Sequence, residues 1–210
     1  MELCVSCKGC RRECPTGVDM ARMKIEVQAA RIRTHGLNLH DRLVGYLPRY
    51  APLAARVPFL ANLRNTLPGL ARLLQGVTGF SADRRLPTWR KDALSDAEYG
   101  ASDSADVILF ADTFNRYFEP ENLRAAMRVL RASGMRVDLA RAPAGERPLC
   151  CGRTFLSTGL VDQARAEAQR LILTLLPKVE AGAMIVGLEP SCLLTLRDEI
   201  PALLPGPEAR

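Results

Sequence analysis

Apolar residues recur at helical spacing in the first part of the chain and in short continuous runs in the last part. Residues 18–36, VDMARMKIEVQAARIRTHG, repeat apolar positions every three or four residues, which predicts an amphipathic helix. Asp19 near its start and Gly36 at its end suit the two ends of a helix. The predicted apolar face consists of Val18, Ala21, Ile25, Ala29 and Ile32.

Residues 37–80 are short apolar pieces interrupted by prolines, so we expect short helices joined at those prolines. Within this connector, residues 56–77 (RVPFLANLRNTLPGLARLLQGV) are amphipathic and rich in arginine. Such a segment either lies on a membrane surface or a partner, or packs on its own domain with the arginines in solvent. The prolines concerned are Pro48, Pro52, Pro58 and Pro68.

The pattern changes after residues 81–104, a polar segment rich in turn formers that we interpret as a linker. Residues 105–112, ADVILFAD, form a continuous apolar run that is typical of a strand buried on both faces. Strand-like and helix-like segments then alternate, which favours an α/β domain with a mainly parallel sheet. The expected order is helix 120–134, strand 135–140, a loop over 141–155, helix 160–180, strand 183–188 and helix 189–204.

The predicted fold class is therefore α/β, with a small all-helical region before the sheet. We divide the chain into residues 1–36, a helical connector and linker over 37–104, and an α/β domain over 105–210.

Composition narrows the class of protein further. The chain has 210 residues, 48% of them hydrophobic and 25% charged, as expected for a globular protein. We find neither a membrane-spanning apolar run nor a signal peptide, and seven cysteines cannot all pair internally. We expect the protein in a reducing, cytoplasmic compartment, either free or bound peripherally at the inner face of the membrane.

Charge is uneven along the chain, whose formal net charge is +6. Residues 1–91 carry 16 Lys and Arg against 6 Asp and Glu, whereas residues 92–210 carry 13 against 17. A basic region suits nucleic acid, anionic lipid or an acidic protein. Because the arginines are spread at helical intervals and aromatics are few, we expect no nucleic-acid partner.

Four cysteines stand together near the start, in CVSCKGCRRECP. Their spacing, C-x2-C-x2-C-x3-C-P, is typical of [4Fe–4S] ligation, in which the fourth cysteine serves a different cluster in two-cluster ferredoxins. A zinc site normally needs a second separated pair of ligands, and the compartment disfavours a disulfide knot. The sequence therefore predicts that Cys4, Cys7, Cys10 and Cys14 bind a [4Fe–4S] cluster.

This quartet leaves the number of clusters open. If three of the cysteines bind one cluster, that cluster lacks a fourth ligand. A second cluster bound by the fourth cysteine would lack three ligands. Either another chain or an upstream segment completes the pair, or the four cysteines hold one cluster among themselves.

Three further cysteines lie late in the chain, Cys150 and Cys151 in PLCCGRTF and Cys192 in EPSC. They resemble the cysteine-rich CCG domain of heterodisulfide reductases and of the iron–sulfur subunits of glycolate oxidase and anaerobic glycerol-3-phosphate dehydrogenase. Thr113 and Glu189 stand where that pattern has two more cysteines. The resemblance implies either that the three thiols still bind metal, with Glu189 or an open position completing the site, or that the domain has kept its fold and lost its metal.

Three stretches, DTFNRYFEPENLRAA, PLCCGRTFLSTGLVDQAR and EPSCLLTLRDE, make the resemblance narrower. They are similar to the C-terminal region of fused FAD-linked dehydrogenases of the D-lactate and D-2-hydroxyglutarate type, and the similarity runs from Leu3 to about Leu204. It implies a ferredoxin-type segment followed by a CCG domain that carries electrons from a flavin to a quinone or cytochrome. This sequence has no flavin-binding region, so FAD is expected only in a partner or in a missing upstream half.

Two other functions remain open from the sequence. The chain is alternatively a non-catalytic docking module with a structural cluster and a metal-free CCG domain. A thiol reductase built on Cys150 and Cys151 is disfavoured, because adjacent cysteines form strained disulfides and the usual redox motif separates them by two residues. We expect no catalytic residue in the chain itself.

The remaining candidates are single residues. His35 and His40 are interpreted as helix-end or solvated histidines rather than ligands, and Trp89 as a packing anchor. Asp112 and Glu119 bracket a loop at the carboxyl end of the first strand, where ligands often bind, and this loop is expected to share a crevice with the CCG loop.

Arg153 follows the CCG motif directly. Its guanidinium group suits either a ligand carboxylate or a salt bridge to a nearby acid.

Overall fold

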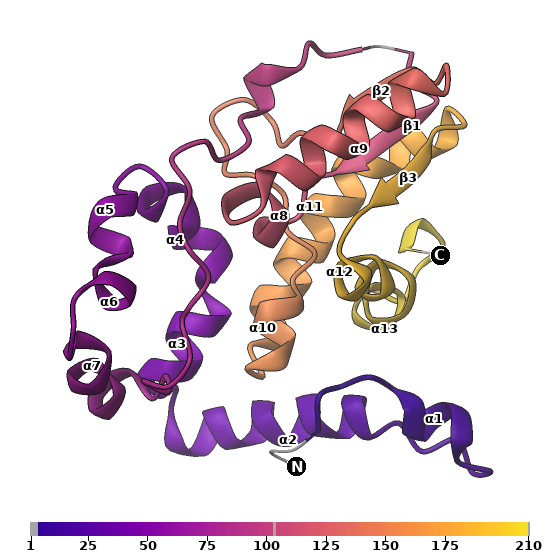
Figure 1. Ribbon diagram of the computed structural model, residues 1–210. Helices are drawn as coiled ribbons and strands as arrows, with labels where there is room; N and C mark the ends of the chain where they lie inside the picture. The colour runs from indigo at the N-terminus through magenta and orange to yellow at the C-terminus, as the bar shows by residue number, and fades with distance from the viewer. Residues whose placement is uncertain (1–3, 103, 210) are drawn as a thin grey trace.

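The computed structural model describes residues 4–102 and 104–209. Its centre is a three-stranded parallel sheet in the order β2-β1-β3 (Figure 1). The strands are β1 (Val107–Phe110), β2 (Val137–Leu139) and β3 (Met184–Gly187). The predicted α/β class with a parallel sheet is confirmed.

Helices cover both faces of this sheet. The central strand β1 is buried between them and is apolar at every position. Ile108 and Phe110 pack toward α11 (Val161–Glu180), whereas Val107 and Leu109 pack toward α9 (Pro120–Ala132). Alternate residues of a strand point to opposite faces, so the continuous apolar run seen in the sequence produces two cores.

Shorter helical elements surround the carboxyl ends of the strands. The interpretation of residues 113–119 as a loop was wrong, because the buried Asp112 accepts hydrogen bonds from the backbone N–H groups of Phe114 and Asn115 and so starts a helix there. The expected single helix over 189–204 is interrupted by a π-helical turn, and Pro201 lies just after it without an N–H group to continue the ladder. The elements are α8 (Thr113–Tyr117), α10 (Arg153–Ser157), α12 (Pro190–Leu194), the π turn η2 (Thr195–Glu199), α13 (Ile200–Leu203) and the 3-10 turn η3 (Pro207–Ala209).

The N-terminal region contains α1 (Gly9–Glu13) and α2 (Met20–His35). Asp19 caps α2 by accepting a hydrogen bond from the backbone N–H of Arg22, and Gly36 ends the helix with a φ of 78°. The predicted helix is thus confirmed, although Val18 lies before it and is exposed.

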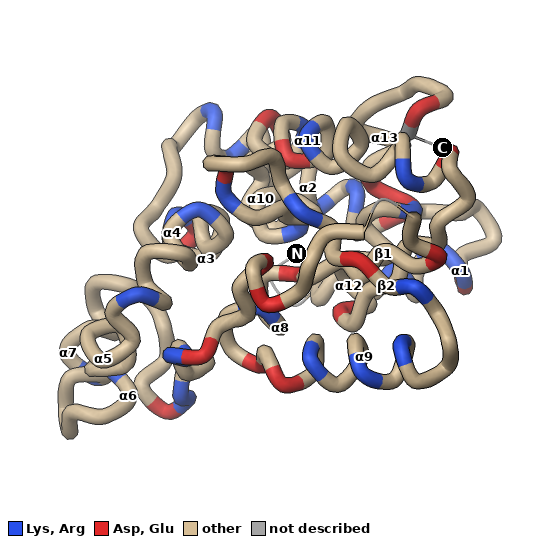
Figure 2. The backbone as a smooth tube through the Cα atoms, turned by 90° about the horizontal axis from the view of Figure 1, so that it is seen from above, with Lys and Arg blue, Asp and Glu red and all other residues tan. Residues whose placement is uncertain are grey.

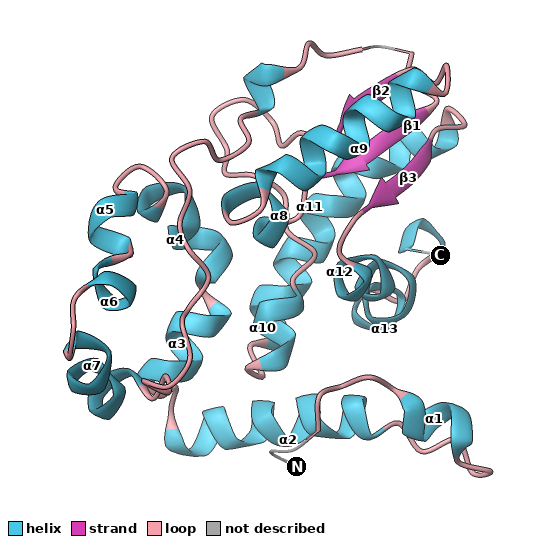
Figure 3. Ribbon diagram, in the orientation of Figure 1, coloured by secondary structure: helices cyan, strands magenta, loops and turns pink. Residues whose placement is uncertain are grey.

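The connector forms five short helices, as expected, although α3 and α4 meet at Tyr46 and α5 and α6 meet at Asn62 rather than at prolines (Figure 3). Pro58 starts one of them, but Pro52 lies inside another and does not break it. Pro48 lies in the first turn of that helix, where its missing N–H would have had no partner within the helix. Pro52 therefore is the one proline that removes a backbone hydrogen bond from this short helix. The five are α3 (Leu39–Gly45), α4 (Leu47–Ala54), α5 (Pro58–Ala61), α6 (Leu63–Thr66) and α7 (Leu70–Thr78).

Close contacts join the helical regions to the α/β part. The Thr154 hydroxyl in α10 donates a hydrogen bond to the carbonyl of Gly45 at 3.0 Å. Gly159, with a φ of +79°, lies so close to α2 that an added Cβ would come within 2.6 Å of the Gln28 carbonyl carbon. The α2 helix lies across the lower end of the molecule in Figure 1, next to α10.

The predicted linker is mostly irregular, with one 3-10 turn, η1 (Asp96–Glu98). It is nevertheless attached to its surroundings, since Asn62 pairs with both the N–H and the carbonyl of Trp89 at 2.9 Å and Leu94 is buried. The division at residues 36 and 104 stays a prediction.

Lysines and arginines are scattered along many elements rather than gathered into one stripe (Figure 2). Of the helices in the described residues, none is both long and apolar enough to cross a membrane.

Candidate functional site

Of the N-terminal cysteines, Cys4 and Cys7 lie on a tight loop that leads into α1, Cys10 lies in α1, and Cys14 follows its end. Ser6 and Lys8 adopt left-handed φ values of 58° and 60°, which turn the chain sharply between the first three cysteines. Cys7 and Cys10 are exposed, whereas Cys4 and Cys14 are partly buried, and all four thiols are free. Cys14 follows the last residue of α1, and its backbone N–H donates to the carbonyl of Cys10 at 2.9 Å, the hydrogen bond that ends this helix. Two of the four thiols therefore face the outside of the molecule.

Cys14 has the environment of a thiolate. Its sulfur lies 3.1 Å from the Thr16 hydroxyl oxygen. This hydrogen bond, together with the backbone N–H groups of Val18 and Thr16, lowers the pKa of Cys14 to about 7. A thiol with this pKa is partly ionised near neutral pH, and the thiolate is the form that binds metals.

Ion pairs hold this loop against the C-terminal π turn. Lys8, between Cys7 and Gly9, pairs with Asp198 and lies 2.9 Å from the Glu199 carboxylate. Arg11 and Arg22 also contact Asp198, each at 3.2 Å. Burial raises the pKa of Asp198, but the hydrogen bonds and charges of Lys8 and Arg11 outweigh it, so the net shift is downward.

Glu199 extends this contact to the CCG segment. Its Oε1 accepts a hydrogen bond from Arg153 Nη1 at 2.9 Å, in addition to the contact with Lys8. Of the two partners expected for Arg153, the structure contains the salt bridge to an acid. Lys8, Asp198 and Glu199 were not predicted from the sequence, where the only signal was a lysine within the cysteine loop and two acids in the last helix.

The C-terminal cysteines are buried around a sulfur–sulfur contact. Cys151 Sγ lies 3.0 Å from Cys192 Sγ, and the Gly152 N–H donates to Cys150 Sγ at 3.3 Å. The hydrogen bond with Cys151 and burial raise the pKa of Cys150 well above its ordinary value. The contact with Cys150 lowers the pKa of Cys151, but the contact with Cys192 and burial outweigh it. The raised pKa values of Cys150 and Cys151 favour their protonated forms, which disfavours a thiol reductase built on these two residues.

Thr113 and Glu189, at the two positions where the CCG pattern has cysteines, have structural roles. Thr113 is the first residue of α8 and is buried, and Glu189 caps α12 by accepting hydrogen bonds from the Ser191 N–H and hydroxyl. Both follow strands whose carboxyl ends lie at one edge of the sheet, where α/β folds bind ligands. Metal binding by Cys150, Cys151 and Cys192 stays a prediction.

The N-terminal residues provide the kind of donors that a [4Fe–4S] cluster takes. Across residues 4–102 and 104–209, no three Cys, His, Asp or Glu side chains converge to hold one metal ion. A cubane has four irons and offers each cysteine its own, so its ligands need not converge on one point. Four free thiols on one short segment, one of them with a lowered pKa, match the donor set that such a cluster requires.

The two histidines make structural contacts. His35 ends α2 at the surface, with Nδ1 2.6 Å from the Thr34 hydroxyl. His40 Nδ1 lies 3.1 Å from the carbonyl of Thr78, and its ring packs on Phe80.

Trp89 and the two acids of the first strand end also have structural contacts. Trp89 packs with its ring centre 4.6 Å from that of Phe118. Asp112 caps α8, and Glu119 accepts a hydrogen bond from Asn122 at 2.8 Å.

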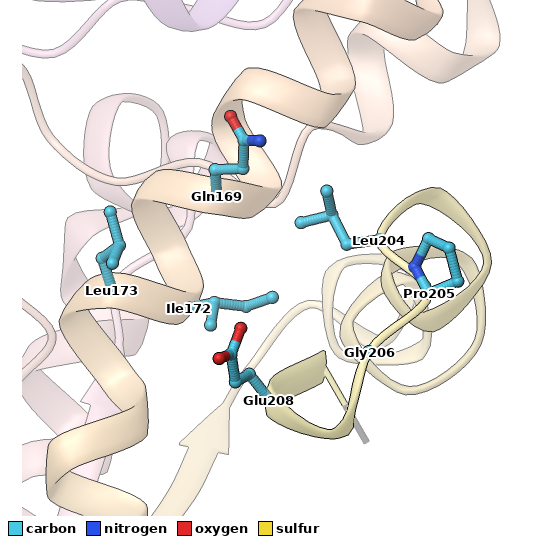
Figure 4. A pocket seen from close by; sticks show the side chains of 7 residues that line it. All are labelled: Gln169, Ile172, Leu173, Leu204, Pro205, Gly206 and Glu208. Carbon is cyan, nitrogen blue, oxygen red and sulfur yellow. The ribbon is translucent and has the colours of Figure 1, made fainter.

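Two hollows in the structure have no cysteine among their lining residues. One, of about 460 Å³, lies between α11 and the C-terminal segment, where Ile172 and Leu204 line it together with Glu208 (Figure 4). The other, of about 390 Å³, lies within the connector and reaches α8 and α10.

The fold and site define a three-layer α/β protein with a helical extension, α1 and α2, that carries four cysteines. The chain is 26% identical over 193 residues to a subunit of the anaerobic glycerol-3-phosphate dehydrogenase of Escherichia coli K12, covering 89% of this chain and 46% of that protein. It is 26% identical over 209 residues to the D-2-hydroxyglutarate dehydrogenase of Pseudomonas putida, and 22% identical over 213 residues to that of Escherichia coli K12.

These last two matches cover 93% and 95% of this chain but 20% of each D-2-hydroxyglutarate dehydrogenase. The chain thus spans about half the length of the first relative and a fifth of the others. No family model matches the chain, and no solved structure matches it significantly. These similarities are therefore to parts of dehydrogenases.

Proposed function

We propose that this chain is the iron–sulfur, electron-transferring part of an FAD-linked dehydrogenase that oxidises a 2-hydroxy acid of the D-lactate or glycolate type. Cys4, Cys7, Cys10 and Cys14 bind a [4Fe–4S] cluster. The flavin belongs to a partner subunit or to an upstream half of the polypeptide, and electrons pass onward to a quinone or cytochrome. The names of the relatives support this function, because each is a dehydrogenase or a dehydrogenase subunit.

The observation that carries the proposal is the cysteine loop itself. Four free thiols lie within one short segment, and Lys8 and Arg11 attach that segment to the π turn. Cys7 and Cys10 are exposed, so a cluster on this loop lies where a partner can approach it. An electron carrier needs both a fixed position and such access.

The chain's residues have distinct parts in this function. When bound, the cluster supplies a one-electron carrier, and the protein supplies its ligands, position and electrostatics. Lys8 and Arg11 bring positive charge to the loop, and Asp198 and Glu199 balance it.

The alternative function is a docking module with a structural cluster and a metal-free CCG domain. The capping role of Glu189, whose carboxylate accepts hydrogen bonds from Ser191, favours the metal-free state of that domain. A metal-free CCG domain is compatible with either function, so the behaviour of the N-terminal cluster separates them.

Reversible reduction of that cluster tests the proposal. The chain is reconstituted anaerobically with iron and sulfide, reduced with dithionite, examined by EPR and reoxidised over several cycles. An electron carrier gives a reduced-cubane signal that returns in each cycle while circular dichroism stays unchanged. A cluster that cannot be reduced and reoxidised without unfolding the chain contradicts electron transfer and supports the docking module.

A further inference from the structure

The outer side of three connector helices carries large apolar side chains that the fold leaves uncovered. The helices α5, α6 and α7 follow one another along one edge of the molecule in both views (Figures 1 and 2), and α6 contacts both of its neighbours. Five of their apolar side chains are between 49% and 74% exposed, and we call these five the outer connector face. They are Phe59, Leu60, Leu67, Leu73 and Val77.

The inner side of the same helices is already packed. Ala61 and Thr78 line the hollow within the connector, and Leu74 is partly buried. On α7, the exposed Leu73 and Val77 are one turn apart and therefore share a second apolar side. Single exposed apolar residues are common on protein surfaces, but apolar residues gathered on one face mark an interaction surface.

Positive charge accompanies this face. Residues 42–85 contain seven arginines and no lysine, and Asp83 is their one acidic residue. None of the seven arginines forms an ion pair with another described residue, whereas Arg124, Arg136 and Arg170 of the α/β part each contact a carboxylate. The fold therefore leaves the charge of the connector unbalanced.

Two of these arginines, Arg84 and Arg85, lie on the irregular segment that follows α7, and both are exposed. Hydrogen bonds fix this segment against the helices of the outer connector face. The Gln75 side chain of α7 accepts from its backbone at 2.8 Å, and the Asn65 side chain of α6 donates to the carbonyl of Leu86 at 2.8 Å. Unpaired cations and exposed apolar side chains thus occupy the same part of the molecule.

The shape of this face favours a lipid surface over a protein partner. Its five residues line neither of the two hollows described above, and the three helices form an outer edge of the molecule (Figure 1). A protein partner typically anchors its side chains in pockets. A bilayer with anionic headgroups needs no pocket, since it attracts arginines and accepts Phe and Leu side chains at the boundary of its acyl chains.

We propose that the outer connector face docks on an anionic lipid surface. Phe59, Leu60 and Leu73 insert below the headgroups, and Arg72, Arg84 and other arginines contact the headgroup anions. The sequence left open whether residues 56–77 lie on a membrane or pack on their own domain, and the two sides of these helices do one each. The inference goes beyond the proposed function, because it requires neither a cluster nor a flavin.

Vesicle flotation tests this surface. The full chain is mixed with vesicles of phosphatidylcholine alone or of equal parts phosphatidylcholine and phosphatidylglycerol, and bound protein is measured after centrifugation. We expect binding at least about tenfold stronger to the anionic vesicles, because the unpaired arginines add electrostatic attraction. Added salt should weaken that binding, since it screens exposed charges.

Exposed apolar residues elsewhere provide a matched control. Phe59→Gln/Leu73→Gln removes two side chains of the outer connector face that are 74% and 73% exposed. Val129→Gln/Leu173→Gln makes the same change at 68% and 78% exposure on α9 and α11. We expect the first pair to weaken binding to the anionic vesicles at least about tenfold and the second to leave it unchanged, with circular dichroism as the check of folding.

The arginines are tested in the same way. Arg72→Gln/Arg84→Gln should reduce binding to the anionic vesicles about tenfold and have little effect with phosphatidylcholine alone. Arg31→Gln/Arg33→Gln removes the same charge from two exposed positions of α2 and should leave binding unchanged.

Several results would overturn the assignment. They are no flotation with anionic vesicles, wild-type flotation of the folded Phe59→Gln/Leu73→Gln variant, and an equal loss in the control pairs. A dimer that the same variant dissociates would assign this face to a second copy, and binding to polyglutamate without binding to vesicles would assign it to an acidic protein. A chain that floats but whose cluster cannot be cycled keeps the lipid surface and removes the proposed electron carrier.

Discussion

At the scale of single residues, the seven cysteines fall into two chemical groups. The N-terminal four lie on an accessible segment, and the C-terminal three are buried at no more than 5% exposure. Reactivity of a thiol follows its exposure and the fraction present as thiolate. The two groups should therefore differ in any measurement that reads thiol reactivity in the folded state.

Alkylation measures this difference. When the iron-free, folded chain is treated with iodoacetamide and analysed by mass spectrometry, we expect labels on Cys7, Cys10 and Cys14. Cys150 and Cys151 should be labelled only after urea is added. Rapid labelling of Cys151 before unfolding would contradict the buried thiol cluster.

Cys14 also has a predicted pH dependence. Because the Thr16 hydroxyl helps lower the pKa of Cys14 to about 7, its alkylation rate in the iron-free chain should reach half its maximum near that pH. Thr16→Val removes the hydroxyl and should move this midpoint upward. Thr34→Val is the control, because Thr34 bonds within α2. The same midpoint in the wild type, Thr16→Val and Thr34→Val would show that Thr16 does not lower the pKa of Cys14.

At the scale of elements, an ion pair aligns the first two strands. The carboxylate of Asp106, just before β1, contacts the Arg136 guanidinium at 2.6 Å and accepts a hydrogen bond from the Arg136 backbone N–H at 2.9 Å. These contacts lower the pKa of Asp106 to about 2. The folded state thus favours the ionised carboxylate.

The pH dependence of stability follows from that shift. A carboxyl whose pKa is lower in the folded state stabilises the fold above its unfolded pKa of about 4, and this stabilisation is lost as the pH falls toward 2. Asp106→Asn should therefore lower the urea midpoint at pH 7, by an amount that narrows as the pH drops below 4. Asp162→Asn, at a far more exposed acid, is the control. A difference that grows on acidification would contradict this role.

Local signals predicted some elements and missed others. The α2 helix was predictable because Asp19 and Gly36 mark its ends within the sequence, and β1 because it is apolar throughout. The helix α8 was missed because one buried carboxylate, Asp112, starts it in a segment that looks like a loop.

The candidate site shows the same limit. The cysteine spacing is local and could be recognised, but the pairing of Lys8 with Asp198 joins residues 190 positions apart. Such a contact depends on the complete fold. The same holds for the hollow within the connector, whose lining residues come from separate parts of the chain.

At the scale of the whole molecule, Gly159 fixes how the cysteine-bearing extension sits on the α/β part. In Gly159→Ala, the left-handed φ costs on the order of 1–3 kcal/mol. The new Cβ would also collide with the backbone of α2, 2.6 Å from the Gln28 carbonyl carbon. We expect faster amide hydrogen exchange across α2 in this variant, with little change in β1.

Gly134→Ala is the matched control. Gly134 has a φ of +84° with nothing within 4 Å of its added Cβ, so it shares the conformational cost without the collision. Equal exchange rates of α2 in the two variants would show that Gly159 does not position the extension.

Iron and sulfide content per chain, measured after anaerobic reconstitution, tests the central claim most directly. The wild type should bind about four irons per cluster. Replacing Cys4, Cys7, Cys10 and Cys14 by Ser together should abolish that iron, and replacing Cys150, Cys151 and Cys192 by Ser should leave it unchanged. A folded wild type without iron, or iron that survives loss of the four N-terminal thiols, would contradict the claim that this loop holds an iron–sulfur cluster.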